Sequence, residues 1–363
     1  MINIKTWNRK NFSLNKQKYQ PTNTYNYDKT LKLYNSFDDS KSPAYIYDLR
    51  KAAECHKMVR KYIENIIKPD MKILDICNLI ENKITELTKI NNLTAGIAFP
   101  TGVSLNNVIA HDSANPDDER IFKYDDICKI DFGVHFNGHI IDSAFSCTFN
   151  PKYEPLLLAS KEAVWTGIKL AGPDALCNEI SKDIQEVIES YEIELDGKIY
   201  PIKAVNDLGG HSIDCYNIHS GKILLCTPCN HSTYQNMRMG HGLWAIECFT
   251  STGIGKYKQS EVNNHYMINK NAPKINYNLK TTKYIHQWII KNRGTLPFTQ
   301  RWLLDNEQIG NKYKIGLKEL LDKNIILAYP PLYDISGSYS SQFEHTLYLH
   351  ENGKEILSAG DDY

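Results

Sequence analysis

The segment 129–142, KIDFGVHFNGHIID, constrains the fold more strongly than any other part of the chain. Its Asn137-Gly138 pair stands between two apolar-rich runs, which is the strongest short-range signal for a two-residue hairpin turn. If the chain turns there, the strands pair outward from the turn and Asp131 lies opposite Ala144. The segment therefore predicts a β-hairpin with a fixed register.

The two aspartates of this hairpin, Asp131 and Asp142, are predicted to share one face. They are diagonal neighbours, whose Cβ atoms lie about 7 Å apart, and carboxylates at that spacing can converge on two metal ions roughly 3.5–4 Å apart. The other face carries the apolar side chains of a core: Ile130, Phe132, Val134, Ile141 and Phe145. The alternative is a one-sided sheet whose polar face meets solvent, as antiparallel strands often have. Ligands elsewhere in the chain must decide between the two.

Length and charge limit the number of domains and the kinds of binding partner. With 363 residues, the chain can form one large domain or two around a sizeable core. Its 42 basic and 42 acidic residues cancel, so no overall field attracts nucleic acid or an anionic membrane. The N-terminus lacks the apolar stretch of a signal peptide, and no apolar run is long enough to span a bilayer. We therefore expect a cytoplasmic protein with no membrane contact. We also expect a monomer, although the sequence does not determine the oligomeric state.

The nine cysteines are an odd number scattered through predicted helices and strands, which favours reduced thiols over a disulfide framework. Cys226 and Cys229 form the one close pair, with His231 nearby. A zinc site there needs further ligands, so a polar loop is the simpler interpretation.

The chain divides into a leader and a long folded region. Residues 1–44 are rich in Asn, Lys, Tyr and Ser, which predicts an extended or partly ordered leader. We expect one folded domain to cover 45–363. Two helices begin this domain, one from Tyr45 to about Pro69 and one from Ile73 to about Leu87, each with an apolar stripe at the helical period.

A pattern from the second helix recurs one hundred residues later. Ile76-Cys77-Asn78 matches Leu176-Cys177-Asn178, and a Pro-Asp pair precedes each. A glycine-containing, strand-like segment that bears a histidine follows each. This repeat predicts two related α+β halves around an antiparallel sheet.

Residues from about 268 to 328 differ in character. They show helical apolar stripes and hold 11 Lys/Arg against 4 Asp/Glu, a net charge of 11 − 4 = +7. We interpret them as a helical subdomain inserted into the main fold. Its basic surface could contact ribosomal RNA or could simply be solvated.

Three further segments supply candidate ligands. His211 follows two glycines, Glu247 lies within Ala-Ile-Glu-Cys-Phe, and Glu344 lies within Gln-Phe-Glu-His-Thr. A carboxylate inside an apolar strand is costly to bury unless a cation or a hydrogen-bond network compensates it. Four carboxylates and one imidazole suit hard to borderline divalent ions such as Mn²⁺, Fe²⁺, Co²⁺ or Zn²⁺. Periodicity does not show that the five side chains converge.

An ordered set of motifs is similar to one known family. These motifs are AFPTGVSLNN (98–107), AH (110–111), DDICKIDFG (125–133), ID (141–142), GHSI (210–213), IH (218–219), AIE (245–247), HYM (265–267), YPP (329–331) and QFEHT (342–346). They resemble the type 2 methionine aminopeptidases, which are pita-bread metallopeptidases. The resemblance covers residues 45–363 and implies a pita-bread fold with pseudo-twofold halves, in agreement with the repeat. It also implies that the basic insert is the feature that separates type 2 enzymes from type 1.

The resemblance implies a pair of divalent ions and a role for each ligand. Asp131 would chelate one ion, and Asp142 and Glu344 would bridge both. His211 and Glu247 would complete the second ion. A hydroxide held between the ions would attack the carbonyl carbon of the N-terminal methionine, with Glu247 accepting its proton. The free α-amino group would bind a metal, so only N-terminal residues would be cleaved.

The resemblance also implies the substrate contacts. His219 would polarise the scissile carbonyl, and His111 would meet the scissile nitrogen. Residues that match the methionine pocket are Phe99, Ile218, Phe249, His265 and Tyr329, together with the two histidines. His111 matches the position that fumagillin-type epoxides alkylate. Taken singly, each histidine could be a buried structural residue and each aromatic an ordinary core residue.

The expected function is removal of the initiator methionine from nascent proteins and peptides with a small second residue. One alternative is a non-catalytic pita-bread adaptor for ribosomes or RNA, but such relatives lose metal ligands that are all present here. Another is a proline-directed peptidase such as prolidase, which uses the same five ligands. Those relatives usually add a substantial N-terminal domain and lack the helical insert.

Overall fold

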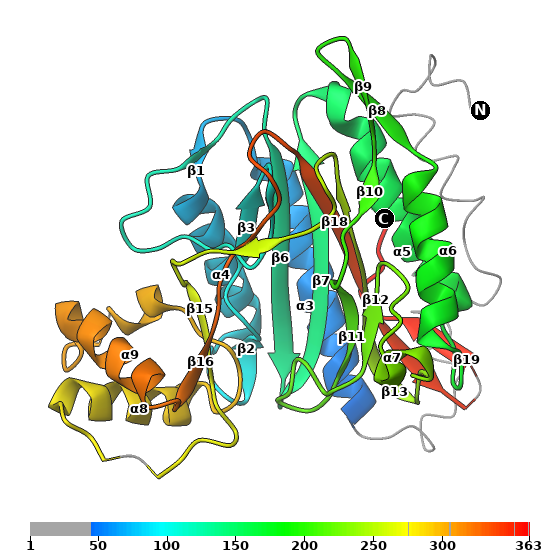
Figure 1. Ribbon diagram of the computed structural model, residues 1–363. Coiled ribbons are helices and arrows are strands. Elements are labelled where there is room, and N and C mark those ends of the chain that lie inside the picture. The colour runs from blue at the N-terminus through cyan, green and yellow to red at the C-terminus, as the bar shows by residue number, and fades with distance from the viewer. Residues whose placement is uncertain (1–44, 275, 305, 352, 362) are drawn as a thin grey trace.

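The computed structural model describes residues 45–363, apart from residues 275, 305, 352 and 362. The predicted leader, residues 1–44, lies outside the described residues. Two units of sheet and helix lie side by side, and a smaller helical unit projects from the edge of the first (Figure 1).

The first half begins with two long helices and continues into a four-stranded sheet. Its elements are α3 (Tyr45–Ile66), β1 (Met71–Lys72), α4 (Ile73–Thr88), β2 (Ala95–Ile97), β3 (Gly102–Leu105), β4 (Val108–Ala110), β5 (Ile121–Phe122), β6 (Ile127–Phe136) and β7 (His139–Thr148). In the sheet, β6 pairs with β2, β3 and β7. The helix α3 covers the apolar face of β6, where the rings of His56 and Phe132 stack with centroids 4.0 Å apart. Both predicted helices are therefore confirmed.

The predicted hairpin is confirmed in its turn and register. Asn137 and Gly138 have φ values of 49° and 80°, the left-handed pair that a two-residue turn of this kind requires. Asp131 lies opposite Ala144, and Asp142 lies opposite Gly133. The five apolar side chains expected on the other face are all buried.

The second half repeats the arrangement with helices before strands. Its elements are a 3-10 turn η3 (Pro151–Tyr153), α5 (Glu154–Leu170), α6 (Cys177–Glu189), β8 (Glu192–Leu195), β9 (Lys198–Pro201), β10 (Lys203–Ala204), β11 (Gly209–Ile213), β12 (Ile223–Leu225), α7 (Ser232–Gln235), β13 (Gly242–Ser251), β14 (Lys258–Gln259), β17 (Leu332–Tyr333), β18 (Ser340–His350) and β19 (Gly353–Ile356). Its main sheet has the order β12-β11-β13-β18-β19, with β10 also paired to β13. The repeat seen in the sequence extends to the backbone: Asp70 and Asp174, which precede α4 and α6, have φ values of 69° and 68°.

Side chains, not a backbone ladder, join β7 of the first sheet to β18 of the second, whereas β4 and β17 of the two halves pair through their backbones. Among the described strands, β7 pairs only with β6, while β18 pairs with β13 and β19. Hydroxyl groups bridge β7 and β18: Ser143 Oγ donates to Glu344 O at 2.7 Å, and Thr346 Oγ1 accepts from Asp142 N at 2.8 Å. Ser146 Oγ likewise donates to Gln342 O at 2.8 Å. We call this line of contacts the seam.

The helical unit lies between two paired strands, β15 (His265–Ile268) and β16 (Ile326–Tyr329). It contains α8 (Lys280–Asn292), η4 (Gln300–Leu303), η5 (Gly310–Lys312) and α9 (Tyr313–Asp322). Its buried side chains form a cluster separate from the main core, including Ile285, Phe298, Leu317 and Leu320. We refer to residues 265–329 as the insert.

All nine cysteines are free thiols in the described region, as the sequence indicated. No described helix is both long enough and apolar enough to cross a membrane.

Candidate metal centre and substrate pocket

The β6–β7 hairpin contributes two carboxylates to one face. Burial raises the pKa of Asp131 to about 6, and a hydrogen bond from Gln342 Nε2 to Asp131 Oδ2, at 3.1 Å, opposes the rise. Asp142 is only 5% exposed, and burial followed by the charge of Asp131 raises the pKa of Asp142 well above its ordinary value. Burial therefore makes the ionised form of both carboxylates energetically unfavourable unless a cation neutralises them.

The central strands of the second half bring two glutamates directly opposite each other. Glu247 on β13 pairs with Glu344 on β18. Like charges in directly opposed positions destabilise a sheet. Burial, and then the charge of Asp142, raises the pKa of both glutamates well above the ordinary value. A positive charge between these strands would remove the repulsion.

A close approach of two backbones places His211. A Cβ atom on Gly210 would lie 2.2 Å from Ala245 O, so only glycine lets β11 run this near β13. His211 Nε2 then lies 3.5 Å from Asp142 Oδ2 and 3.6 Å from Glu247 Oε1. Burial, and then neighbouring His219, lowers the pKa of His211 well below its ordinary value. The imidazole is therefore neutral near pH 7, the form in which it binds metals.

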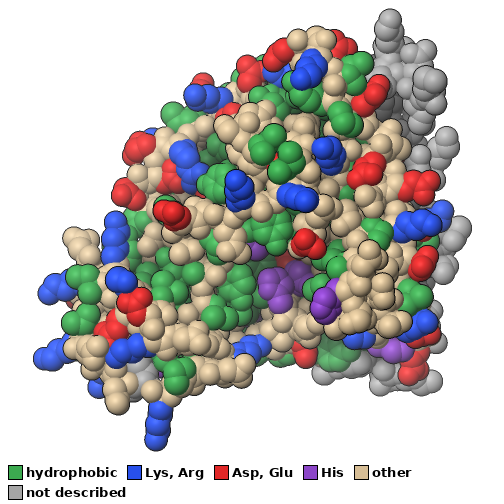
Figure 2. Space-filling model, in the orientation of Figure 1, with side chains coloured by type: hydrophobic (Ala, Val, Ile, Leu, Met, Phe, Trp, Pro, Cys, Tyr) green, Lys and Arg blue, Asp and Glu red, His purple; other side chains and the backbone are tan. Residues whose placement is uncertain are grey.

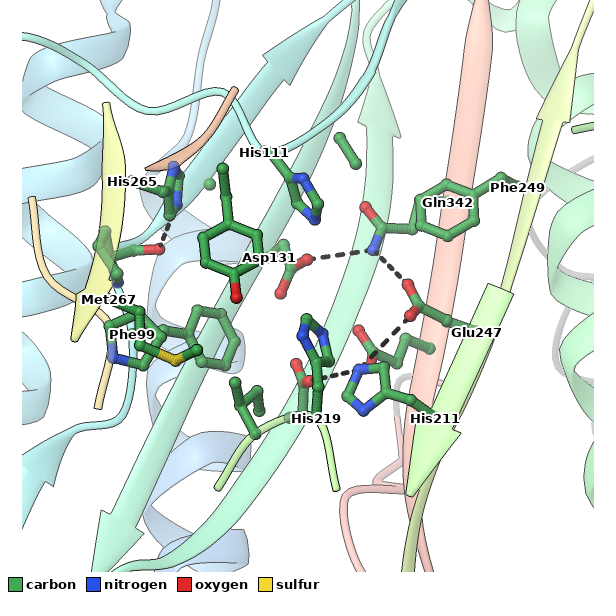
Figure 3. A pocket seen from close by; sticks show the side chains of 18 residues that line it. Phe99, His111, Asp131, His211, His219, Glu247, Phe249, His265, Met267 and Gln342 are labelled. Atoms are coloured by element: carbon green, nitrogen blue, oxygen red, sulfur yellow. Dashed lines mark hydrogen bonds and ion pairs between the residues drawn. The ribbon is translucent and has the colours of Figure 1, made fainter. Parts of the chain in front are cut away.

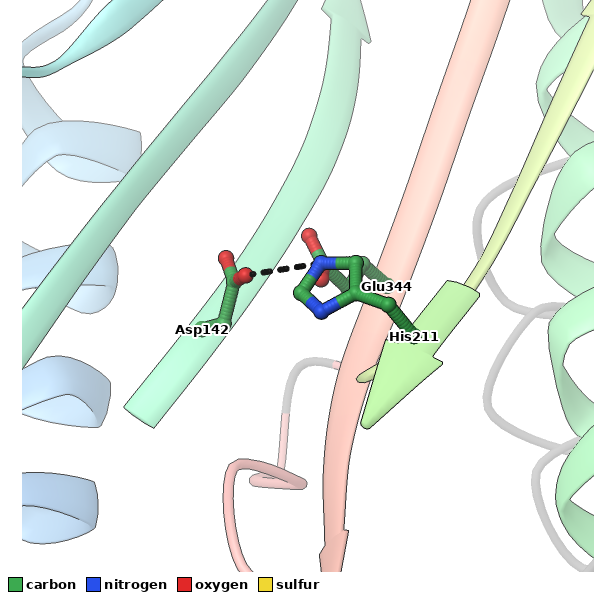
Figure 4. Close-up of side chains that lie close together, drawn as sticks. All are labelled: Asp142, His211 and Glu344. Carbon is green, nitrogen blue, oxygen red and sulfur yellow. Dashed lines mark ion pairs between the residues drawn. The ribbon is translucent and has the colours of Figure 1, made fainter. Parts of the chain in front are cut away.

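These side chains fit a divalent cation. Ligand atoms of Asp142, His211 and Glu344 all lie within 4.8 Å of one another (Figure 4). Neither oxygen of Glu344 has a hydrogen-bond donor among the described residues, and Asp131 Oδ1 also lacks one. Buried carboxylate oxygens without donors are expensive unless a cation compensates them. Oxygen ligands with one imidazole suit the harder and borderline divalent metals.

Two more histidines face this cluster. The ring of His219 meets that of His211 edge-on, with centroids 4.2 Å apart. His111 follows β4 with a φ of 62°, and its ring lies 6.4 Å from that of His265. Burial lowers the pKa of His219, while burial and then His265 lower the pKa of His111 to about 3. Both rings are therefore neutral near pH 7.

Beside the carboxylates, the pocket becomes apolar. Figure 2 shows histidine side chains in a hollow bordered by hydrophobic groups, and Figure 3 shows Phe99, His265 and Met267 on the side away from Glu247. The apolar lining is Phe99, Pro100, Ala110, Ile218, Phe249, Met267, Pro297 and Tyr329. One end of the pocket can therefore hold a cation and the other an apolar side chain.

Comparisons with known proteins identify the family. Residues 48–261 match the model of metallopeptidase family M24. The chain is 46% identical over 317 residues to methionine aminopeptidase 2A of Arabidopsis thaliana. The aligned region covers 87% of this chain and 70% of that relative. It is 45% identical over 318 residues to methionine aminopeptidase 2 of Schizosaccharomyces pombe, and the aligned region covers 87% of this chain and 73% of that relative. This chain belongs to the type 2 methionine aminopeptidases of family M24.

Solved structures agree on the fold of this methionine aminopeptidase. A thermophilic Arx1 matches with a TM-score of 0.72 at 19% identity, over 88% of this chain and 91% of that one. A methionine aminopeptidase from Thermotoga maritima matches with a TM-score of 0.58 at 19% identity, over 88% and 98%. The predicted pita-bread fold is therefore confirmed.

All twelve residues predicted for the site line this one pocket of the methionine aminopeptidase. They are Phe99, His111, Asp131, Asp142, His211, Ile218, His219, Glu247, Phe249, His265, Tyr329 and Glu344. The structure adds lining residues to which the sequence assigned no role, among them Met267, Pro297 and Gln342. Gln342 could have been found, because it stands two positions before Glu344 in a strand and so shares its face. Pro297 gave no such signal, since it lies in an irregular segment of the insert.

Only one group of metal-binding side chains occurs in the described region, and it is the group above. The Cys226–Cys229 segment is not part of it. There, Cys226 Sγ accepts a hydrogen bond from Phe249 N at 3.3 Å, and Cys229 Sγ accepts one from His231 N at 3.5 Å. Both thiols thus serve as local acceptors.

Proposed function

We propose that this methionine aminopeptidase holds two divalent ions, Mn²⁺, Fe²⁺, Co²⁺ or Zn²⁺, between the halves of its fold. Asp131 would bind one ion, and Asp142 and Glu344 would bridge both. His211 and Glu247 would complete the second. The observation that carries this proposal is the set of buried carboxylate oxygens without donors among the described residues, Asp131 Oδ1 and both oxygens of Glu344.

The bound ions would supply Lewis acidity, lowering the pKa of water toward neutrality and polarising a carbonyl. The side chains around them would move protons and hold the peptide. Glu247 is the proton acceptor in this scheme, because its carboxylate lies in the same pocket as the other ligands and can take a proton from water held by the ions. Gln342 Nε2 donates to Glu247 Oε2 at 3.3 Å and so fixes the orientation of that carboxylate.

The two neutral histidines would act on the scissile peptide bond. His219 would donate a hydrogen bond to the carbonyl oxygen as negative charge develops there. His111 would contact the scissile nitrogen. A neutral imidazole has one N–H donor and one lone pair, so it can donate one hydrogen bond and accept another. The low pKa values of both histidines support this assignment, since neither carries charge near pH 7.

We propose that the substrate is the N-terminal methionine of nascent proteins and peptides whose second residue is small. An unbranched, polarisable thioether suits the apolar end of the pocket, whose walls include Phe99, Met267 and Tyr329. The position of His111 beside this cavity also supports its alkylation by fumagillin-type epoxides. A covalent adduct on His111, located by peptide mass spectrometry, is the expected result.

The deciding assay uses purified protein with Mn²⁺ or Co²⁺ and the peptide Met-Ala-Ser. We expect release of free methionine that stops on chelation and returns with metal. Asp131→Asn should abolish turnover because it removes a chelating charge. His111→Ala should lower turnover while the metal content, measured by elemental analysis, stays at the wild-type level. The proposal fails if no divalent metal supports methionine release, and the role of His111 fails if its variant loses the metals.

The location of the enzyme and its contact with the ribosome are inferred from its surface charge and its domain organisation. We propose a cytoplasmic monomer whose catalytic domain spans 45–363, with the helical subdomain at about 268–328 contacting the ribosome. Eight of the nine lysines in 268–328 are exposed, whereas Arg293 and Arg301 are buried, so lysines supply the outward charge. Co-sedimentation with ribosomes at low and high salt would test this contact, because binding to phosphates weakens steeply with salt.

A further inference from the structure

The apolar end of the pocket is built from two separate parts of the chain. Phe99 and Pro100 follow β2 of the first half. A second wall comes from the insert: Met267 on β15, Tyr329 on β16 and Pro297 after α8. The space available to the substrate side chain therefore depends on how these two walls are held relative to each other.

One buried arginine contacts the backbone of both walls. Arg293, 2% exposed, donates from Nη2 to Ile97 O at 2.8 Å and to Ala98 O at 3.0 Å. These carbonyls immediately precede Phe99. The same guanidinium donates to Pro297 O from Nε at 3.2 Å and from Nη2 at 3.1 Å. Arg293 thus links a pocket residue of the insert, Pro297, to the segment that carries Phe99.

The environment of Arg293 favours a role in shape over a role in charge. Within the described part of the chain, its four hydrogen bonds all go to backbone carbonyls and none to a carboxylate, and Nη1 finds no acceptor there. Its guanidinium stacks over Trp302, 5.0 Å from the ring centroid, and Trp302 Nε1 donates to Glu81 Oε2 at 2.8 Å. A guanidinium buried without a carboxylate partner is a costly way to fill space. Its planar set of donors is what an aliphatic side chain or a lysine cannot reproduce.

We propose that Arg293 is a positioning residue that sets the width of the methionine pocket. It acts through the wall residues Phe99 and Pro297 and touches neither substrate nor metal. This inference rests on the proposed function, because it concerns the pocket for the first side chain of the peptide. His265 Nε2, 3.2 Å from Pro100 O, and Glu81, which binds both Arg301 and Thr101 N, also join the two walls. Without the Arg293 contacts, the walls can move apart beside Phe99 and Pro297, where a branched side chain gains room.

Other contacts keep both segments folded when Arg293 is changed. Ala98 N donates to Gly133 O at 2.9 Å, and Tyr266 and Phe298 exchange two backbone hydrogen bonds of 2.8 and 2.7 Å. Each wall therefore retains an anchor within its own sheet or subdomain. Substitution of Arg293 should loosen the gap between the walls without unfolding either one.

The test compares Arg293→Lys and the harsher Arg293→Met with a matched control. Arg60→Lys changes another buried arginine, which donates to Ser358 O at 3.0 Å and lies 4.6 Å from the Tyr363 ring centroid, on α3. With Met-Ala-Ser and Leu-Ala-Ser as substrates, we expect both Arg293 variants to raise KM for the methionine peptide and to leave kcat nearly unchanged. The preference for Met over Leu, as a ratio of kcat/KM, should fall about tenfold. Arg60→Lys should keep the wild-type ratio.

A second readout needs neither metal nor turnover. Amide hydrogen exchange of metal-free protein should speed up at residues 97–98 and 294–298 in the Arg293 variants, and not in Arg60→Lys. The inference is overturned if Arg293→Lys is folded and keeps the wild-type Met/Leu ratio, or if Arg60→Lys shifts that ratio equally. Failure of the wild-type enzyme to release methionine would instead reject the proposed function.

Discussion

Gly133 shows how much a missing side chain contributes to the site. It stands two positions after Asp131 on the same face of β6 and directly opposite Asp142. A Cβ atom built on it would lie 2.2 Å from Phe99 Cε1, so the phenylalanine ring occupies the space that any larger residue would take. The apolar wall and the carboxylates therefore meet at one glycine.

The Gly133→Ala variant should push the Phe99 ring into the pocket. We expect KM for Met-Ala-Ser to rise about tenfold or more, because the lost space is about one methyl group of a close-fitting apolar site. Steady-state kinetics with excess metal would measure the change. Gly172→Ala is the control, because a Cβ there meets nothing within 4 Å and should leave KM alone.

Repulsion among the buried carboxylates makes a second prediction. Glu344→Gln keeps the shape of the side chain but removes one charge from a pair of directly opposed glutamates. We expect the melting temperature of the metal-free protein to rise by roughly 2–6 °C, while methionine release is lost. Calorimetry on chelator-treated samples would check the first part. A lower melting temperature for the metal-free variant would show that the carboxylates do not repel one another as described.

At the scale of elements, a buried ion pair joins α4 to the insert. Arg301 of η4 donates to both oxygens of Glu81 on α4, each at 2.7 Å. Glu81 Oε1 also accepts from Thr101 N at 3.2 Å, so one carboxylate holds the insert and the loop that follows Phe99. Burial would raise the pKa of Glu81, but Arg301 and the Trp302 N–H together hold it below the ordinary value.

This pair should make the stability of the insert pH-dependent. Since the pKa of Glu81 is lower in the folded than in the unfolded state, its stabilising contribution is present above the unfolded value and is lost as pH falls through the folded one. Glu81→Gln leaves Arg301 buried without its partner and should cost about 3–5 kcal/mol near neutral pH. Urea unfolding at pH 7 and at about pH 4 should show the difference from wild type shrinking in acid. A difference that grows in acid would contradict this account.

Local sequence signals predicted the hairpin but not the contacts between distant segments. The Asn137-Gly138 turn fixed the register of β6 and β7 because both residues tolerate the left-handed backbone that the turn requires. The helices α3 and α4 followed from apolar stripes. Arg293 had no comparable signal: its partners Ile97 and Ala98 lie almost two hundred residues away, and a lone arginine after a helix resembles a surface residue. That the five candidate ligands share one pocket was likewise predicted only from the family resemblance, because periodicity assigns a residue to a face of its strand and does not identify the partner strand.

At the scale of the whole molecule, the proposed metal ligands come from both halves. Asp131 and Asp142 belong to the first sheet, while His211, Glu247 and Glu344 belong to the second. Ions bound by all five therefore join two sheets that the seam connects only through side chains. Bound metal would therefore hold the two halves of the molecule together.

Metal should accordingly stabilise the entire fold. At a free concentration one hundred times the dissociation constant, one bound ion contributes about 2.7 kcal/mol. We expect the melting temperature to rise with added Mn²⁺ or Co²⁺ and to fall on chelation, in a single transition that covers both halves. Calorimetry with and without chelator measures this. If elemental analysis shows that metal is bound but the melting temperature does not change, metal binding does not stabilise the fold and the prediction is wrong.

The seam has a consequence for how such an enzyme can change over time. Because hydroxyl groups of Ser143, Ser146 and Thr346 bridge β7 and β18, single substitutions can alter the spacing of these strands without breaking either ladder. Asp142 lies on β7 and Glu344 lies on β18. A lineage can therefore adjust the separation of the two carboxylates proposed to bridge the ions, and with it the size of ion that the proposed site prefers, by small steps that leave both sheets intact.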